Sequence, residues 1–200
     1  MNILFLYNGV IDPEKGGIQR VTSVLADYFE GKGHTVWYLS LDFYKKETPH
    51  PRRQLMFPDS RSLDAVENMV YWENILLEKH IDIVINQSAQ DPKSSKLMRI
   101  AKKRCKIFSV HHTAPLGKIL NFEAVYADRF KGISHIVLFL SKYRVFQNLI
   151  LNSFIWKYRN HYLDLCDASD YFVLLSNEFK PEFSRLIGKV LPKNVIAISN

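Results

Sequence analysis

The 200-residue sequence contains little cysteine and no long hydrophobic run. Its two cysteines, Cys105 and Cys166, have neither metal-ligand spacing nor a CxxC partner, so we expect two reduced, partly buried thiols in a reducing compartment. No stretch reaches the roughly 18 apolar residues that a transmembrane helix needs, and the apolar run after Met1 is too short for a signal peptide. These absences predict a cytoplasmic protein.

Two phosphate-binding signatures are missing as well. Gly9, Gly16 and Gly17 do not form the GxGxxG pattern of dinucleotide-binding proteins, and no glycine-rich loop ends in Gly-Lys-Ser or Gly-Lys-Thr as in P-loop proteins. Neither cysteine nor a cluster of Asp and Glu accompanies the adjacent histidines His111 and His112, which argues against zinc. We therefore expect neither a dehydrogenase nor a P-loop kinase, and no bound metal or cofactor.

The sequence is instead rich in the residues that build a folded core. Hydrophobic residues make up 47% of it, with 13 Phe, 10 Tyr and 3 Trp, so a disordered chain is not expected. The net charge is +7, with basic residues clustered at 102–104 and again between Lys142 and Arg159. Such clusters suit a nucleic acid, an anionic membrane or a phosphorylated substrate, and they equally suit solvated helix faces.

Apolar strands and amphipathic helices alternate along the chain. The opening unit has a buried strand at 2–7, a helix that ends at Gly31-Lys32-Gly33 and a strand at 34–41. In this helix the apolar residues recur at three- and four-residue steps, which predicts that they form the buried face: Ile18, Val21, Val24, Leu25 and Tyr28. Further strands are predicted at 54–57, 82–86, 106–110, 171–175 and 195–199, and further helices at 63–79, 94–104 and 177–187.

This alternation predicts an α/β fold, with a doubly wound, mostly parallel, Rossmann-like sheet and helices on both faces. Residues 116–169 interrupt the alternation and predict a helical insertion before the last strands. The sequence ends on a strand with no helix after it. Because that is unusual for a complete domain of this type, we expect 1–200 to be one domain that stops at a domain boundary.

The loop between the first strand and the first helix is the first candidate site. Ligands of open α/β sheets bind beyond the carboxyl ends of the strands. At this position Gly16 and Gly17 would allow a positive φ and a close approach of the backbone to a ligand, and the helix N-terminus offers free N–H groups to a phosphate or diphosphate. The alternative is a tight turn that only lets the helix dock on the sheet.

Two other strand ends carry polar residues. His111 and His112 follow the strand at 106–110, where histidine can hydrogen-bond a sugar hydroxyl or transfer a proton. Adjacent residues of an extended segment point to opposite sides, so we expect one histidine in the cleft and the other in the interior or in solvent. Asn86 and Ser88 follow the strand at 82–86, where they are suited either to hold sugar hydroxyls or to cap the next helix.

Several segments, taken in order, resemble glycosyltransferase family 4. Near the start these are Gly16-Gly17-Ile18 with Arg20, and Gly33-His34-Thr35-Val36. Farther on they are the strand that closes with Val110-His111, the segment DASDYFVLLS at 167–176 and the segment VIAISN at 195–200. Each motif is weak alone, but their order and spacing together cover nearly the whole chain.

The resemblance implies a GT-B fold, in which two Rossmann-like domains face each other across the active site. It implies that 1–200 is the acceptor-side N-terminal domain, that the donor-binding C-terminal domain is absent, and that this chain alone is inactive. The implied reaction is metal-independent transfer of a sugar, with retained anomeric configuration, from a nucleotide sugar to a glycan or lipid-linked acceptor. The implied process is cell-surface polysaccharide biosynthesis.

The family motifs also imply roles for single residues. Gly16 and Gly17 match the turn that approaches the donor diphosphate. His111 matches the strand-end histidine that contacts the transferring sugar, and His112 takes that place if the register shifts by one. On the acceptor side the candidates are Asn86, Ser88 and Arg20.

The basic, aromatic part of the helical insertion has two interpretations. Enzymes of this kind often act on lipid-linked acceptors at the inner membrane face, where basic groups attract anionic lipids and aromatic side chains such as Phe154, Trp156 and Tyr158 can enter the interface. The stretch therefore predicts peripheral contact with an anionic membrane. Alternatively, it is an ordinary insertion that covers the sheet.

Three other functions fit parts of the sequence. A nucleotide-sugar epimerase has the same architecture but needs a carboxylate-rich, self-contained site. A basic nucleic-acid-binding module needs a recognition motif, and none is visible, so we expect no nucleic-acid partner. A receiver-like or other α/β binding domain would place an acidic cluster at its strand ends, which this sequence lacks.

Overall fold

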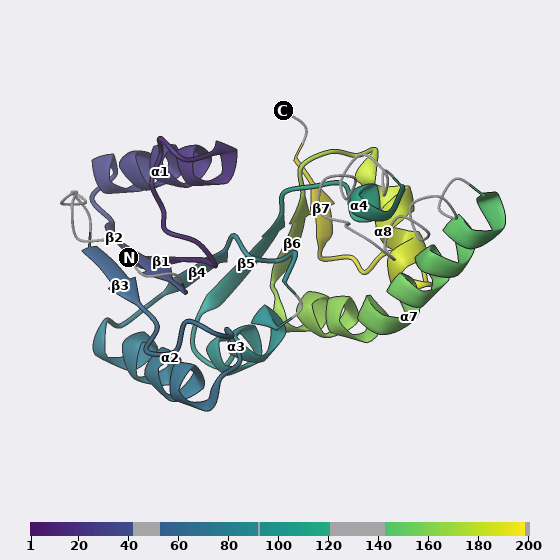
Figure 1. Ribbon diagram of the computed structural model, residues 1–200. Coiled ribbons are helices and arrows are strands. Elements are labelled where there is room, and N and C mark those ends of the chain that lie inside the picture. Colours follow the sequence, from purple (N-terminus) through teal and green to yellow (C-terminus); the bar gives the residue numbers. More distant parts are fainter. Residues whose placement is uncertain (42–52, 92, 121–142, 199–200) are drawn as a thin grey trace.

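Seven parallel strands form one sheet in the computed structural model, which describes residues 1–41, 53–91, 93–120 and 143–198 (Figure 1). The strands are β1 (Asn2–Tyr7), β2 (Thr35–Ser40), β3 (Arg53–Met56), β4 (Ile83–Asn86), β5 (Lys106–His111), β6 (Tyr171–Leu174) and β7 (Val195–Ala197). The helices are α1 (Gly17–Gly31), α2 (Val66–Glu78), α3 (Ser94–Ala101), α4 (Gly117–Leu120), α7 (Arg144–Ala168) and α8 (Phe179–Ile187). The predicted Rossmann-like α/β fold is confirmed.

The strand order β3-β2-β1-β4-β5-β6-β7 reverses direction at β1. One side of β1 pairs with β2, where Ile3 is aligned with Val36, and the other side pairs with β4, where Ile3 is aligned with Ile83. At such a reversal the loops after the two neighbouring strands diverge and leave a crevice at their carboxyl ends. The loops after β1 and β4 are therefore the expected place for a ligand.

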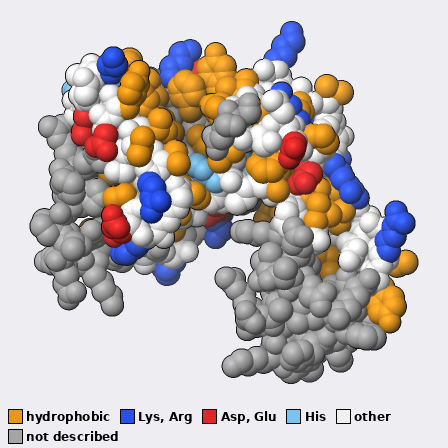
Figure 2. Space-filling view, turned by 90° about the horizontal axis from the view of Figure 1, so that it is seen from above, with side chains coloured by type: hydrophobic (Ala, Val, Ile, Leu, Met, Phe, Trp, Pro, Cys, Tyr) orange, Lys and Arg blue, Asp and Glu red, His pale blue; other side chains and the backbone are white. Residues whose placement is uncertain are grey.

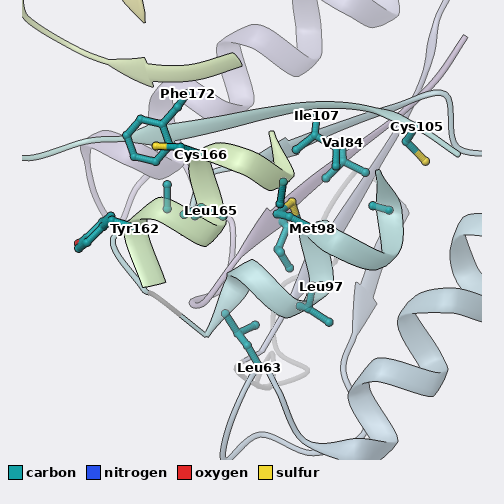
Figure 3. Close-up of a cluster of buried hydrophobic side chains, with 14 of the residues drawn as sticks. Leu63, Val84, Leu97, Met98, Cys105, Ile107, Tyr162, Leu165, Cys166 and Phe172 are labelled. Carbon is teal, nitrogen blue, oxygen red and sulfur yellow. The ribbon is translucent and has the colours of Figure 1, made fainter. Parts of the chain in front are cut away.

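Helices lie on both faces of the sheet. On one face, α1 contributes Ala26 to a buried cluster with Ile3, Phe5 and Tyr38. The other face is covered by α2, α3, α7 and α8, whose buried side chains include Trp72, Leu97, Leu165 and Phe183. Figure 3 shows side chains of α3 and α7 lying beside the strand residues Val84, Ile107 and Phe172.

The predicted buried face of α1 is only partly right, because Leu25 packs against the buried cluster but three of the other predicted residues do not. Val21, Val24 and Tyr28 are 50%, 61% and 59% exposed, and the buried residues are Thr22, Ser23 and Ala26. Small side chains let the helix lie close to the sheet, and the Thr22 hydroxyl meets its hydrogen-bonding need locally by donating to the Ile18 carbonyl at 2.7 Å. Val21, Val24 and Tyr28 are left on the outer side, while Leu25 and Phe29 pack against the cluster.

Helix α7 is the described part of the predicted insertion, with α4 before it; residues 121–142 of that insertion lie outside the described residues. The helix packs against α3 through its C-terminal half. Arg99 forms an ion pair with Asp164 at 2.5 Å, and Lys102 donates to the Asp167 carbonyl. Part of the basic cluster at 102–104 therefore serves helix packing.

Other local predictions agree with the structure. The short strand expected near 54–57 is β3, and Gly33 has the positive φ, 81°, expected of a glycine just beyond a helix. Cys105 and Cys166 are free and buried, and burial raises the pKa of their thiols to about 11 and about 12. Among the described residues, no helix is both long and apolar enough to cross a lipid bilayer.

Candidate active site

The loops after β1 and β4 are tied together at the carboxyl edge of the sheet. The Asn8 backbone N–H donates to the Ser88 Oγ at 2.8 Å, and the Asn8 side-chain amide donates to the Asp91 Oδ2 at 3.1 Å. These two hydrogen bonds span about eighty residues of sequence and fix the shape of the crevice at the strand reversal.

The side chain of Asn86 forms hydrogen bonds that hold the loop after β4 at this same edge of the sheet. Its Oδ1 accepts from the Ser88 N–H at 3.0 Å, while its Nδ2 donates to the hydroxyls of Ser94 at 3.2 Å and Ser109 at 3.4 Å. Asn86 and Ser88 are both 0% exposed. Their polar groups thus contact the protein itself, which is the arrangement expected of residues that shape a loop rather than of residues that meet a ligand directly.

A pocket of about 450 Å³ opens between these loops and α7. Seen from above, a histidine side chain is visible near the middle of this face, among uncharged side chains (Figure 2). The residues that line the pocket come from the loops after β1, β4 and β5 and from α7: Asn8, Gln90, Asp91, His111, Thr113, Ala114, Pro115, Phe154, Tyr158 and Tyr162. Its volume is that of a small-molecule site.

One wall of the pocket is aromatic. Phe154, Tyr158 and Tyr162 follow one another at four-residue steps along α7, so they share one face of the helix. The Phe154 and Tyr158 ring centroids are 4.6 Å apart. Burial and the nearby Asp91 raise the pKa of the Tyr162 hydroxyl, which therefore stays protonated at neutral pH. Flat apolar rings with polar edges suit the faces of a sugar ring.

His111 lies at the base of the pocket and is 2% exposed. Its Nδ1 is 2.8 Å from the Thr113 carbonyl oxygen, which can only accept, so Nδ1 carries a proton. Its Nε2 is 3.4 Å from the Tyr162 hydroxyl, and its ring packs near Tyr162, Phe172 and Phe183. Protein groups thus orient this ring from several sides.

His112 has a different environment. It is half-buried, and its Nε2 lies 2.5 Å from the Gln87 Oε1. Because a carbonyl oxygen accepts, Nε2 carries the proton, and burial lowers the pKa of the ring to about 4. The ring is therefore neutral at pH 7 and keeps Nδ1 as an acceptor, for which the described residues provide no hydrogen-bond donor.

The depressed pKa of His112 predicts a pH-dependent stability. An imidazole whose pKa is lower in the folded state stabilises the fold fully above its unfolded value of 6.5, and this contribution is lost as the pH falls toward 4. We expect a loss of about 2 kcal/mol between these limits, less than the full shift implies because solvent screens part of the ring. Urea unfolding of the wild type and of His112→Gln between pH 7.5 and 4 measures it. Parallel stability curves for the two proteins would contradict the assignment.

Gly16 is the N-cap of α1 and Gly17 is its first residue, at the far end of the loop that follows β1. Neither residue lines the pocket. Neither uses the positive φ that a glycine allows: Gly16 is extended, with φ 168°, and the positive-φ glycines of the described chain are Gly33 and Gly188. A Cβ on Gly17 would meet nothing within 4 Å. The first turn of α1 has no side-chain cap and no acidic residue, so its N–H groups are left for solvent or a ligand.

The structure therefore brings together some of the predicted site residues and not others. His111 lines the pocket, while His112, Asn86 and Ser88 lie beside it, and Arg20 is exposed on α1. Whether any of them contacts a substrate stays a prediction. The described residues contain no group of three or more His, Cys, Asp and Glu side chains placed to hold a metal ion.

Sequence reasoning did not identify Asn8, Gln90, Asp91, Tyr158 and Tyr162 as site residues. Two signals could have found them. Asn8 is the first residue after a buried strand, and the aromatic residues of α7 recur at a helical spacing. Gln90 and Asp91 gave no such signal, because only the pairing of β1 with β4 brings their loop next to Asn8.

Comparisons with known proteins agree with this architecture. The family model for Glycosyltransferase Family 4 matches residues 15–200. A crystal structure of a glycosyltransferase from Rickettsia africae ESF-5 is similar with a TM-score of 0.56 and 16% identity, over 100% of this chain and 42% of that one. The apo form of the lipopolysaccharide outer core galactosyltransferase WaaB is similar with a TM-score of 0.57 and 17% identity, over 100% of this chain and 46% of that one.

At these identities the two structures bear on the fold alone. The chain spans less than half the length of each of them. No curated protein matches the sequence.

Proposed function

Because this chain belongs to glycosyltransferase family 4, we propose that it is the acceptor-side, N-terminal domain of a retaining glycosyltransferase. The complete enzyme would transfer a sugar from a nucleotide sugar to a glycan or lipid-linked acceptor without a bound metal. The observation that supports this most directly is the pocket at the strand reversal, beside a strand-end histidine and next to the loop that leads into α1. A second domain would supply most contacts to the nucleotide.

The proposed mechanism is electrostatic and positional. In transfer from a nucleotide sugar, negative charge grows on the departing diphosphate. The N-terminus of α1 carries a partial positive charge and has no side-chain cap, and there is open space beside Gly17. We assign this helix end to the diphosphate. His112, with an unprotonated Nδ1, is suited to accept a hydrogen bond from a sugar hydroxyl, while His111 shapes the base of the pocket.

Peripheral contact with an anionic membrane is a further part of the proposal. Along the first four turns of α7, Val145, Leu149 and Trp156 are 75%, 60% and 85% exposed and share one side of the helix, and Arg144 and Lys157 lie beside them. An apolar stripe flanked by basic groups suits the headgroup region of a bilayer. A location at the inner face of a membrane would follow from it.

The two alternatives receive less support. Among the described residues that line the pocket there is a single carboxylate, Asp91, whereas an epimerase would need a carboxylate-rich site. A nucleic-acid module would need a basic, aromatic groove, and the described lining of this pocket contains no lysine or arginine.

The test uses a longer protein in which this chain is followed by the proposed donor-binding half. Its thermal unfolding is followed with UDP-, GDP- and ADP-sugars, and with NAD and random-sequence DNA as controls. At a ligand concentration of a hundred times Kd, binding stabilises a protein by about 2.7 kcal/mol. We expect stabilisation by one class of nucleotide sugar in the longer protein and not in the 200-residue chain. A salt-sensitive shift with DNA, without any response to nucleotide sugars, would overturn the proposal.

A further inference from the structure

Gln87 is the hydrogen-bond partner of the His112 ring among the described residues. It is the first residue after β4, and His112 is the first residue after the neighbouring strand β5. The Gln87 Oε1 lies 2.5 Å from the His112 Nε2, although the two residues are 25 positions apart in the sequence. The contact therefore depends on the pairing of β4 with β5 and belongs to the folded edge of the sheet.

The position of Gln87 is fixed by its surroundings. Its backbone N–H donates to the Leu6 carbonyl at 2.8 Å, which ties it to the end of β1. The residues on either side of it, Asn86 and Ser88, are both 0% exposed, and the Ser88 N–H donates to the Asn86 Oδ1 at 3.0 Å. Gln87 is itself 1% exposed, so the enclosing protein restricts its side chain to the place where it meets His112.

The amide oxygen of Gln87 determines which nitrogen of His112 carries the proton. A neutral imidazole has one N–H donor and one bare nitrogen that accepts, and its hydrogen-bond partners select between the two forms. Because the Gln87 Oε1 can only accept, it selects the form with the proton on Nε2 and leaves Nδ1 as an acceptor. A ligand group that meets Nδ1 must then bring an O–H or N–H donor.

The partner of His112 is an amide and not a carboxylate, and this difference controls the charge of the ring. A carboxylate would accept from the same Nε2–H, but its negative charge would favour the imidazolium, in which both nitrogens are donors. An amide oxygen accepts the hydrogen bond without that charge. Burial lowers the pKa of His112 to about 4, and no charged side chain of the described chain forms an ion pair with the ring.

We infer that Gln87 is a positioning residue, which holds His112 in the neutral form with the proton on Nε2 and thereby keeps Nδ1 as the acceptor offered to a ligand. The inference rests on the proposed transferase function, in which His112 accepts a hydrogen bond from a sugar hydroxyl. Gln87 acts through His112 and needs no contact with a substrate. This role is separable from packing, because another side chain of similar size can fill the same space, whereas selection of the tautomer needs an acceptor.

Nitrogen-15 NMR of the 200-residue chain tests the inference, because the chemical shifts of the two ring nitrogens show which of them carries the proton. The signals of His112 are assigned by their loss in His112→Gln. At pH 7 we expect a single tautomer of the wild-type ring, with the proton on Nε2. A ring protonated on Nδ1, or an even mixture of the two forms, would show that Gln87 does not present its oxygen to the ring and would overturn the inference.

Two variants of Gln87 distinguish positioning from packing. Gln87→Met keeps the length of the side chain and removes the acceptor, so the tautomer with the proton on Nδ1 should appear beside the first. Gln87→Glu keeps an acceptor in the same place and adds a charge, so it should raise the pKa of the His112 ring by about 1–3 pH units. Gln147→Glu, the same change on the exposed surface of α7, is the control and should leave that pKa unchanged.

Each variant of Gln87 is decisive alone, so the inference stays testable if one of them does not fold. An unchanged tautomer in Gln87→Met, or an unchanged ring pKa in Gln87→Glu, would show that Gln87 only fills space, and the inference would fail.

A binding measurement connects the tautomer to the proposed function. In the longer, two-domain protein, Gln87→Met should raise severalfold the Kd of whichever of UDP-glucose, GDP-mannose and ADP-glucose stabilises the wild type. An equal Kd would overturn the inference while the transferase proposal stands. Binding of none of the three by the wild type would count against the transferase proposal instead, and the NMR of the 200-residue chain, which needs no donor, would still decide whether Gln87 holds His112.

Discussion

Replacement of Gly17 by alanine is expected to lower sugar transfer by the longer, two-domain protein by about tenfold to a hundredfold. A methyl group on the first residue of α1 would enter the open space beside Gly17, at the helix end proposed for the diphosphate. Hydrogen bonds to a charged group contribute about 1.5–3 kcal/mol each, so the displacement of one explains a loss of this size. Initial rates at varied donor concentrations measure it.

The fold itself should tolerate this change. A Cβ on Gly17 would contact no other atom, and alanine favours a helix over glycine by up to about 1 kcal/mol. Gly31→Ala provides the matched control, since Gly31 ends the same helix, its Cβ would also meet nothing within 4 Å, and it lies far from the loop. We expect similar stability in both variants and normal transfer only in Gly31→Ala. Equal transfer activity in Gly17→Ala and Gly31→Ala would show that the N-terminus of α1 is not part of the donor site.

Replacement of Trp72 by alanine should destabilise the 200-residue chain by about 3–5 kcal/mol, the usual range for loss of a buried tryptophan. Trp72 is 0% exposed in the larger cluster, and its indole N–H donates to the Leu97 carbonyl at 2.8 Å, which joins α2 to α3. Such a loss is a large part of the roughly 5–15 kcal/mol that stabilises a typical domain. Urea unfolding followed by circular dichroism measures it.

Trp156 is the matched control for that experiment. It is 85% exposed on α7, so Trp156→Ala should change stability by no more than about 0.5 kcal/mol. The same variant examines the proposed membrane contact: vesicles that contain anionic lipid should sediment less of it than of the wild type. If Trp156→Ala is destabilised as much as Trp72→Ala, then Trp156 is packed inside the protein in solution. The membrane proposal would then be wrong, because this side of α7 would not be accessible to a bilayer.

The order and type of the main elements could be predicted from the sequence, because strands and helices that become buried have local patterns of apolar residues. Four- to six-residue apolar runs such as Ile83–Asn86 marked strands covered on both faces, and Gly33 marked the end of α1. The sequence-based prediction of the buried face of α1 was only partly right, since Leu25 packs against the core and Val21, Val24 and Tyr28 do not. Periodicity identifies apolar residues on a helix but not how closely the helix approaches the sheet, and here Thr22, Ser23 and Ala26 permit a close approach that places Val21 and Val24 outside.

The candidate site could be predicted only in part for a related reason. The strand ends that carry His111 and Asn86 were visible, because strand and loop are adjacent in sequence. The contacts of Asn8 with Ser88 and Asp91 depend on which strands pair, and strand order has no local signature. Whether a strand-end residue faces a ligand or the protein was likewise beyond the sequence: Asn86 proved to be fully enclosed by hydrogen bonds to its neighbours.

The strand order also has a consequence for biosynthesis. From β1 outward, the strands β4, β5, β6 and β7 stand in the sheet in the order in which they are translated. Each new strand can therefore add to the edge left open by the one before it, without displacing a strand already paired. The exception is β1 itself. One of its edges stays unpaired until β4 has been synthesised, because Ile3 is aligned with Ile83, 80 residues later. Until then the nascent chain exposes an apolar strand edge, the kind of edge that chaperones protect.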